Sequence, residues 1–328
     1  MHLKKVFPLS VNFAIVLSLS GCGGGSAPEP VASTSSTSGS SNPATVASAA
    51  SGSSNPASVL CSLAYSAFNS SASVNATSTS TWSCGATTRN LAANGIPDHA
   101  VGTFPNVNNP NAITAQNVVA ALRLAPVKSA TITQRGGPLG DTGYILNGVK
   151  VDAATAGTCG NTGGSSCGLV NNSGPWSIEA LGQTAFNFGT DSNNAHVQPN
   201  GAYHYHGVPE GFVTSLKKGA AMTLIGWAAD GFPIYARYGF SVATDASSSV
   251  RAMTSSYRLK SAPDANRPST TTYAMGTFSQ DYQYIANSGD LDECNGRTGI
   301  TPEFPSGTYH YFATDSYPYL QRCIKGSL

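Results

Sequence analysis

Charged side chains are scarce in this 328-residue sequence. They make up 10% of it, with 17 Lys and Arg against 16 Asp and Glu, whereas an average soluble domain has about 25%. Without a basic surplus the chain cannot neutralise a phosphate backbone, which argues against nucleic-acid binding. Glycine-rich phosphate loops and dinucleotide fingerprints are also lacking, so no nucleotide site is indicated. Because 40% of the residues are apolar and 9% aromatic, an acidic disordered chain is excluded as well.

The N-terminal apolar run, residues 6–19, follows two lysines and is too short to span a bilayer. It ends in LSGC at residues 19–22, which resembles the lipobox of bacterial lipoproteins. The resemblance implies a signal peptide over residues 1–21, a lipid on the Cys22 sulfur, and an exported protein attached to the membrane only by that lipid. Gly23, not Asp, comes next, which in a Gram-negative host indicates the outer membrane. The alternative is an ordinary signal peptide with a chance cysteine.

Residues 22–58 lack aromatic side chains and carry a single charge, on Glu29. The segment contains a repeat, SGSSNPA, at residues 38–44 and 51–57. With so little apolar surface to bury, it cannot offset the entropy cost of becoming ordered. We therefore expect a flexible tether rich in Ser, Gly and Pro. The remaining residues, 59–328, are expected to form a single domain.

Cys-x-x-Cys pairs are also lacking, although six cysteines follow Cys22. An even number of cysteines in an exported protein favours disulfides, and thiolate ligation of a metal is the alternative. Sequence leaves the connectivity open, but short loops close most easily, so neighbours along the chain are the favoured partners. The favoured pairs are Cys61–Cys84, Cys159–Cys167 and Cys294–Cys323.

Helical patterns are few and strand patterns are many. Only residues 116–124 and 210–217 are fair helix candidates. Strand-like segments flank Asp230-Gly231, which is a strong hairpin signal. Pro233, early in the second of these strands, indicates an edge strand or an irregular start. We expect a mainly β fold, namely a β-sandwich or a related all-β domain with long loops pinned by disulfides.

Histidine is rare, with six in the chain, yet three fall within eleven residues. If YHYH at residues 203–206 is a strand, His204 and His206 point to one face and the two tyrosines to the other. Two neutral imidazoles at that spacing can converge on one Zn or Cu ion. His196 shares their face only if the intervening loop has an odd number of residues, which Asn-Gly at 200–201 leaves open. The alternative is surface imidazoles that are solvated or bonded to carbonyl groups.

The YHYH segment has an echo near the C-terminus, because GTYHY at residues 307–311 repeats most of GAYHY at residues 201–205. The repetition indicates two equivalent strands, which would bring His310 beside the first cluster. His99 is a further candidate for completing a metal site.

Two acidic residues are candidate ligands or acid–base groups. Asp230 lies at the tip of the predicted hairpin, where Asp-Gly also needs no function beyond the turn. Asp292 belongs to an acidic loop beside Cys294, where its carboxylate either is solvated or completes or orients a histidine site.

With these motifs in view, the chain resembles the YHYH-domain proteins. The resemblance covers roughly residues 90–326 and leaves the tether outside. It implies membership but no reaction, because the family has none assigned, and so it supplies no catalytic residues. The segments that carry it are YHYH at 203–206, NGIPDH at 94–99, LNGV at 146–149, HVQPNG at 196–201, GWAADGFPIY at 226–235, LDECNG at 291–296 and YHYF at 309–312.

Three function classes fit these observations. The first is a lipid-anchored extracytoplasmic protein that binds a divalent or copper-type metal, Cu or Zn, through His204, His206 and further histidines. The second is a surface-binding or adhesion module without a metal. The third is a metal- or histidine-dependent hydrolase with an imidazole or Asp230 as general base. An open coordination position in a cleft would favour the enzyme, whereas a saturated site would favour a structural or carrier role.

Overall fold

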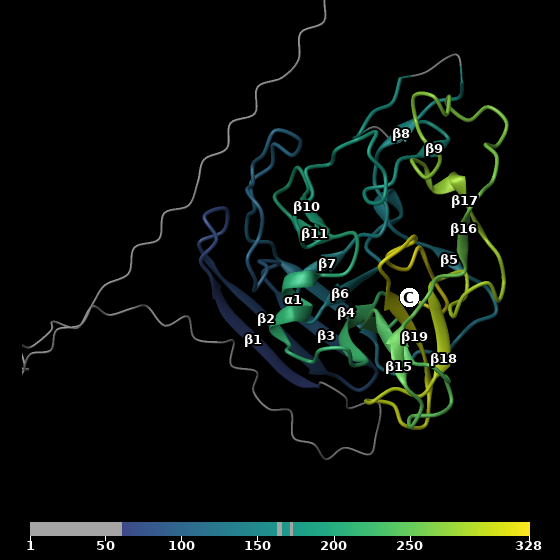
Figure 1. Cartoon of the computed structure of the whole chain (residues 1–328). Helices are drawn as coiled ribbons and strands as arrows, with labels where there is room; N and C mark the ends of the chain where they lie inside the picture. Colours follow the sequence, from purple (N-terminus) through teal and green to yellow (C-terminus); the bar gives the residue numbers. More distant parts are fainter. Residues whose placement is uncertain (1–60, 163–165, 171–172) are drawn as a thin grey trace, which may run out of the picture. The chain divides into compact units, whose positions relative to one another are not determined.

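The computed structural model describes residues 61–162, 166–170 and 173–328 (Figure 1). The predicted signal peptide, lipobox and tether, residues 1–58, lie outside the described residues. All described residues belong to one compact unit. Within them, the helices are too short or too polar to cross a membrane.

One layer is a four-stranded antiparallel meander, drawn in purple and blue in Figure 1. Burial alternates from residue to residue along its first two strands, as expected for a sheet with one covered face. The helix expected over residues 116–124 is wrong, because this segment pairs with the third strand along its length and has two β-branched valines. The strands are β1 (Ser62–Asn69), β2 (Ala76–Cys84), β3 (Thr88–Ala93) and β4 (Val118–Arg123).

The other layer is a mixed sheet of eight strands in the order β10-β11-β7-β6-β12-β13-β19-β18. The hairpin predicted at Asp230-Gly231 is confirmed as the antiparallel pair β12–β13. Of the two alternatives for Pro233, the edge position is wrong, because β13 lies inside the sheet. Pro233 instead stands at the first residue of β13, a strand position that tolerates proline. The strands are β6 (Gly143–Ile145), β7 (Lys150–Val151), β10 (Ala195–Val197), β11 (Tyr203–Tyr205), β12 (Thr223–Ala228), β13 (Pro233–Ala236), β18 (Gly296–Gly299) and β19 (Thr308–Ala313).

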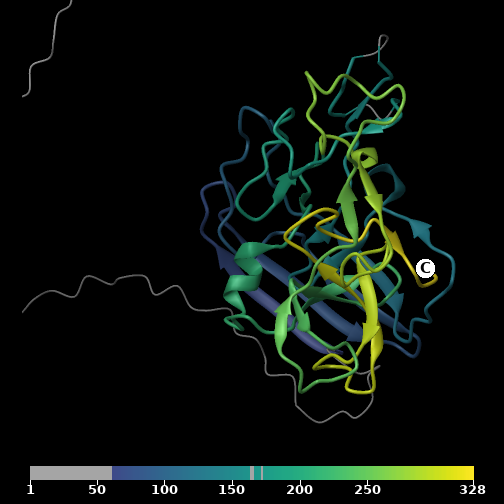
Figure 2. The ribbon, with the colours of Figure 1, turned by 45° about the vertical axis from the view of Figure 1, so that its right-hand side comes forward.

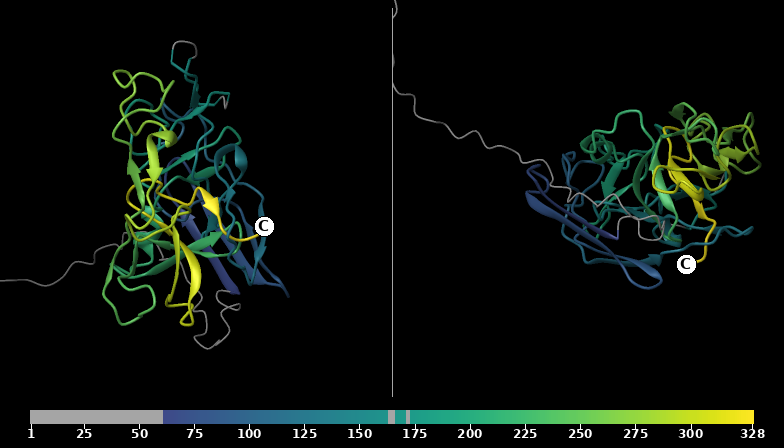
Figure 3. Two further views of the ribbon diagram at one scale, coloured as in Figure 1. Left: turned by 90° about the vertical axis from the view of Figure 1, so that its right-hand side faces the viewer. Right: turned by 90° about the horizontal axis from the view of Figure 1, so that it is seen from below.

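The two sheets pack face to face, which confirms the sandwich-like prediction (Figure 3). Trp82 Nε1 and Ser80 Oγ, on β2, both donate to the carbonyl oxygen of Leu146, at 2.9 and 2.7 Å. The Arg89 guanidinium carbon lies 3.7 Å from the centre of the Trp227 ring. The polar groups buried between the two sheets thus have hydrogen-bond or stacking partners, which offset the cost of removing them from water.

Short elements and disulfides complete the unit. The helix predicted over residues 210–217 is confirmed as α1 (Glu210–Ser215). The favoured disulfides are confirmed as well, with bonds Cys61–Cys84, Cys159–Cys167 and Cys294–Cys323. Figure 2 shows the yellow C-terminal strand β20 (Cys323–Ile324) beside the blue strand β5 (Thr133–Gln134), with which it pairs. The remaining pairs are β20 (Cys323–Ile324) with β5 (Thr133–Gln134), β8 (Thr158–Cys159) with β9 (Trp176–Ser177), β14 (Tyr238–Phe240) with β15 (Val250–Ala252) and β16 (Tyr257–Leu259) with β17 (Tyr282–Tyr284); the 3-10 turns are η2 (Gly137–Leu139) and η3 (Ser279–Asp281).

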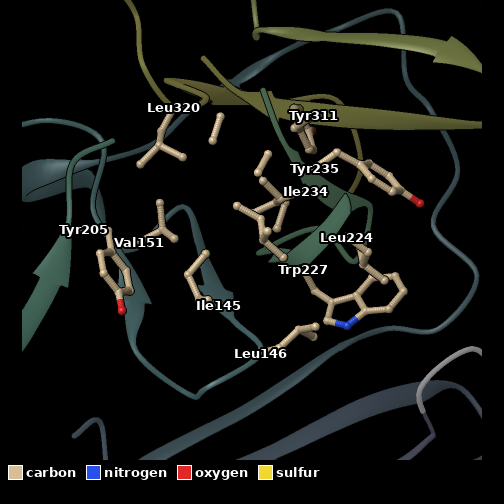
Figure 4. Close-up of a cluster of buried hydrophobic side chains, with 14 of the residues drawn as sticks. Ile145, Leu146, Val151, Tyr205, Leu224, Trp227, Ile234, Tyr235, Tyr311 and Leu320 are labelled. Carbon is tan, nitrogen blue, oxygen red and sulfur yellow. The ribbon is translucent and has the colours of Figure 1, made fainter. Parts of the chain in front are cut away.

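The eight-stranded sheet repeats itself about its centre. Outward from the centre, one half runs β6, β7, β11, β10 and the other runs β12, β13, β19, β18. In both halves the inner two strands are antiparallel and the third is parallel to the second. Tyr205 pairs with Val151 as Tyr311 pairs with Ile234, so these pairs are equivalent. Figure 4 shows Tyr205 and Val151 on the left of the core and Tyr311 and Ile234 towards the right.

The outer hairpins repeat in detail. Tyr203 Oη donates to an Asp191 carboxylate oxygen at 2.8 Å, as Tyr309 Oη does to Asp292 at 3.0 Å. The echo in the sequence therefore marks two equivalent strands, as expected. It does not bring His310 to the first cluster, because four strands separate β11 from β19. At about 4.8 Å per strand, the two lie about 24 Å apart across the sheet.

Candidate metal centre

The β10–β11 hairpin places three histidines on one face. His196 pairs with His204, and Val197 pairs with Tyr203, so the loop between the strands has an odd number of residues. His206 continues the ladder through its N–H, which donates to the Asn194 carbonyl oxygen at 2.8 Å. The question that the sequence left open is thereby resolved, and His196 joins the face of the other two.

The three imidazoles converge through their Nε2 atoms. His206 Nε2 lies 3.0 Å from His196 Nε2 and 3.0 Å from His204 Nε2. The potential ligand nitrogens of the three residues all lie within 4.8 Å of one another. A metal bonded to nitrogen at about 2.0 to 2.1 Å brings neighbouring ligand nitrogens to about 2.9 to 3.4 Å, for angles of about 90 to 109°. The observed spacing fits a three-histidine metal site.

The Nδ1 contacts of His196 and His204 indicate which nitrogen of these two rings is free to bind. His196 Nδ1 lies 2.8 Å from the Phe188 carbonyl oxygen, and His204 Nδ1 lies 3.2 Å from that of Ala202. A carbonyl oxygen only accepts, so both Nδ1 atoms carry the proton and both Nε2 atoms present lone pairs. His206 Nε2 faces both lone pairs, and one N–H shared between two acceptors makes a weaker bond to each. A cation at the centre removes this conflict.

Burial favours the neutral, ligating form of the imidazoles. His204 and His206 are buried, with exposed fractions of 1% and 2%. Desolvation lowers the pKa of His196 and holds the pKa values of His204 and His206 well below the usual histidine range. Protons therefore compete poorly with a metal ion for these nitrogens.

A pocket of about 730 Å³ opens onto the centre, and all three histidines line it. Three protein ligands leave a fourth position of a tetrahedral ion for water or another molecule. Because all three histidines line the pocket, a molecule in the pocket can approach an ion that they hold.

Asp152 also lines this pocket, and the sequence analysis missed it. Its N–H donates to the Tyr205 carbonyl oxygen at 3.0 Å, so it extends the parallel β7–β11 ladder to the position beside His206. Its carboxylate accepts hydrogen bonds from the Gly137 N–H and from Gln198 Nε2. Burial is the main cause of its raised pKa. The alternation of side chains around β7 could have indicated the face of the strand on which Asp152 lies. Nothing in the sequence indicated that β7 pairs with β11, and this pairing is what places Asp152 beside His206.

The remaining histidine candidates lie elsewhere. His99 Nε2 lies 2.6 Å from Tyr205 Oη, on the face of β11 opposite the three histidines. His310 directs Nδ1 to the Thr308 carbonyl oxygen at 3.1 Å and packs its ring against Tyr235. Neither belongs to the three-histidine group.

The two acidic candidates have structural partners outside the centre. Asp230 is buried in the β12–β13 turn, where it accepts hydrogen bonds from Tyr311 Oη at 2.6 Å and from the Gly326 N–H at 2.8 Å. Asp292 accepts hydrogen bonds in the second outer hairpin and lies 3.5 Å from Lys325 Nζ. Both positions fit a role in the fold.

The equivalent hairpin in the other half of the sheet, β18–β19, has the same backbone arrangement but lacks two of the three histidines. His310 is the counterpart of His204, and it makes the same contact to the carbonyl oxygen two residues earlier. The counterpart of His196 is Arg297, which pairs with His310, and the counterpart of His206 is Phe312. The same backbone arrangement thus carries three potential ligands in one half and one in the other.

Comparison with known proteins identifies a family. No curated protein matches the chain. No solved structure matches it. A family model described as "YHYH protein" matches residues 119–326, which is more than half of the chain and includes the three-histidine centre. The chain therefore belongs to the YHYH protein family.

Proposed function

We propose that this YHYH protein binds a zinc or copper ion through His196, His204 and His206. The observation that carries the proposal is the convergence of three Nε2 atoms, two from buried histidines and one from the half-buried His196, at a spacing that fits a metal. Imidazole ligands suit both metals. A surface adhesion module without a metal would leave these facing lone pairs unexplained.

We place this metal-binding domain outside the cytoplasm, attached to the membrane by a lipid on Cys22. The support is the LSGC sequence at residues 19–22, before a tether and a domain with three disulfides. Disulfides persist in oxidising compartments, which agrees with an exported protein.

A second candidate function is metal-dependent hydrolysis, favoured by the pocket at the open coordination position. A metal ion there would lower the pKa of a bound water, and the Asp152 carboxylate would accept its proton. Asp152→Asn keeps the shape of the side chain and removes the base. For the hydrolase, turnover of a p-nitrophenyl ester by the zinc-loaded protein should fall about 10²- to 10⁴-fold with metal content unchanged. Equal turnover in both proteins would reject this second function.

The metal proposal is tested by elemental analysis of protein purified without a histidine tag and then supplied with zinc or copper. We expect about one equivalent per chain, and a large loss in His204→Ala and in His206→Ala because each removes one of three ligands. His310→Ala is the matched control, since it makes the same change at the equivalent strand position and should keep the metal. Circular dichroism verifies the fold of each variant. Unchanged metal in both ligand variants would reject the proposal.

A further inference from the structure

We propose that the pocket above the histidine centre binds an uncharged small molecule with an apolar body, one donor atom of which occupies the fourth position of the metal. This inference rests on the proposed metal site and adds the class of ligand that the site takes.

The walls of the pocket are suited to an apolar body. Most of the lining surface is apolar, with Leu169, Phe188 and Val197 among its residues. The volume of about 730 Å³ lies within the range of about 300 to 1,000 Å³ that is usual for small-molecule sites. A single water molecule on the metal would fill little of this volume and would leave the apolar walls without an apolar partner.

The charges of the lining disfavour an anion. Among the described residues, the lining contains one carboxylate, that of Asp152, and neither Lys nor Arg. An anionic group away from the metal would therefore meet no side-chain cation in this described lining and would lie near the Asp152 carboxyl group. A neutral ligand avoids both disadvantages and still supplies a lone pair to the metal.

The other half of the sheet indicates that the open space is a property of this half. There, the place of Asp152 is taken by Tyr235, whose ring centre lies 5.4 Å from that of His310. The Arg297 guanidinium carbon lies 5.4 Å from the Phe312 ring centre. Large side chains thus occupy the counterpart position, whereas His196 and Asp152 line an open pocket. The sequence differences that make the centre also leave room for a ligand.

The test uses the full-length protein loaded with Co²⁺, whose visible absorbance reports coordination. Three probes are titrated, namely imidazole, 4-phenylimidazole and 4-(imidazol-4-yl)benzoate, whose carboxylate sits on the far end of the phenyl ring and cannot reach the metal that the imidazole binds. We expect 4-phenylimidazole to bind about tenfold or more tightly than imidazole, because its phenyl ring is transferred from water to apolar walls. 4-(Imidazol-4-yl)benzoate should bind more weakly than 4-phenylimidazole by at least the same factor. Equal or tighter binding of the benzoate would overturn the preference for an uncharged ligand. Equal affinity for imidazole and 4-phenylimidazole would overturn the inference while leaving the metal site intact.

Variants of the wall separate the pocket from the metal. Ala156 is exposed and lines the pocket, so Ala156→Glu should lower the affinity for 4-phenylimidazole about tenfold without changing that for imidazole. Ala246→Glu makes the same change at an exposed position outside the lining and should alter neither. A parallel loss of both affinities in Ala156→Glu would contradict the inference. Failure of the protein to bind Co²⁺ would reject the metal site and this inference together.

Discussion

At the scale of single residues, two histidines at equivalent strand positions differ in whether they can bind a metal, because their neighbouring side chains differ. His204 and His310 have the same strand position, and both direct Nδ1 to the carbonyl oxygen two residues earlier. His204 faces two further imidazoles, whereas His310 is enclosed by Tyr235 and Phe312. A buried histidine in a Tyr-His-Tyr segment is therefore not by itself a ligand. Whether such a histidine can bind a metal depends on the side chains at the neighbouring positions of the paired strands.

His310 should make the stability of the protein depend on pH. Its burial lowers its pKa to about 3, whereas a histidine in the unfolded chain titrates near 6.5. The unfolded state therefore binds the proton first, so the stabilisation is complete above about pH 6.5 and is lost as the pH falls towards 3. His310→Asn keeps a donor near the Thr308 carbonyl oxygen. We expect it to reduce the slope of unfolding free energy against pH by about 1.4 kcal/mol per unit between pH 6 and 4.

Urea unfolding at several pH values, with a chelator present, measures this slope. The histidines of the metal centre contribute equally in the wild type and the variant, so the difference belongs to His310. Identical slopes in the two proteins would show that His310 does not resist protonation in the fold.

At the scale of elements, strand β11 separates two functions by its alternation. His204 faces the pocket, as does His206 just beyond the strand. Tyr205 faces the core, where its hydroxyl is bonded to His99 Nε2 at 2.6 Å and Asn147 Nδ2 at 3.1 Å. Tyr205→Phe removes this hydroxyl from a buried site, so we expect a loss of about 1 to 3 kcal/mol of stability. Metal content at native conditions should not change, because the ligands lie on the other face. Denaturant unfolding and elemental analysis check both parts, and loss of metal from a folded Tyr205→Phe protein would contradict the separation.

What could be predicted from sequence was local. The shared face of His204 and His206 follows from the two-residue period of a strand, and the turn at Asp230 follows from the Asp-Gly pair. The face of His196 depends on a loop whose length the sequence did not determine. The position of Asp152 beside His206 depends on β7 pairing with a strand more than 50 residues later.

The same reason explains the error over residues 116–124. Val118–Arg123 pairs with β3, and its burial alternates with a period of two in that sheet. A weak local helical pattern was outweighed by this pairing with another part of the chain.

At the scale of the whole molecule, the disulfides should leave no thiol in the folded domain. The described residues include six cysteines, and all six are paired. Alkylation of the mature protein under denaturing, non-reducing conditions should therefore leave these cysteines unlabelled, as measured by peptide mass spectrometry. Labelling after reduction is the positive control. Labelling of several cysteines before reduction would favour thiolate ligation over disulfides.

The location of the whole molecule is expected to depend on one atom, the sulfur of Cys22. Removal of the predicted signal peptide would take Lys4 and Lys5 with it and leave 15 basic and 16 acidic residues, so a general electrostatic attachment to anionic lipids is not expected. Cys22→Ala should therefore move the protein from the membrane fraction to the soluble one, as measured by fractionation and immunoblotting in a bacterial host. Ser26→Ala, a neighbouring change in the tether, should leave it in the membrane.

Since the histidine centre lies more than 170 residues after Cys22, released Cys22→Ala protein should still bind its metal. Retention of Cys22→Ala in the membrane fraction would reject the lipid anchor and leave the metal site untouched.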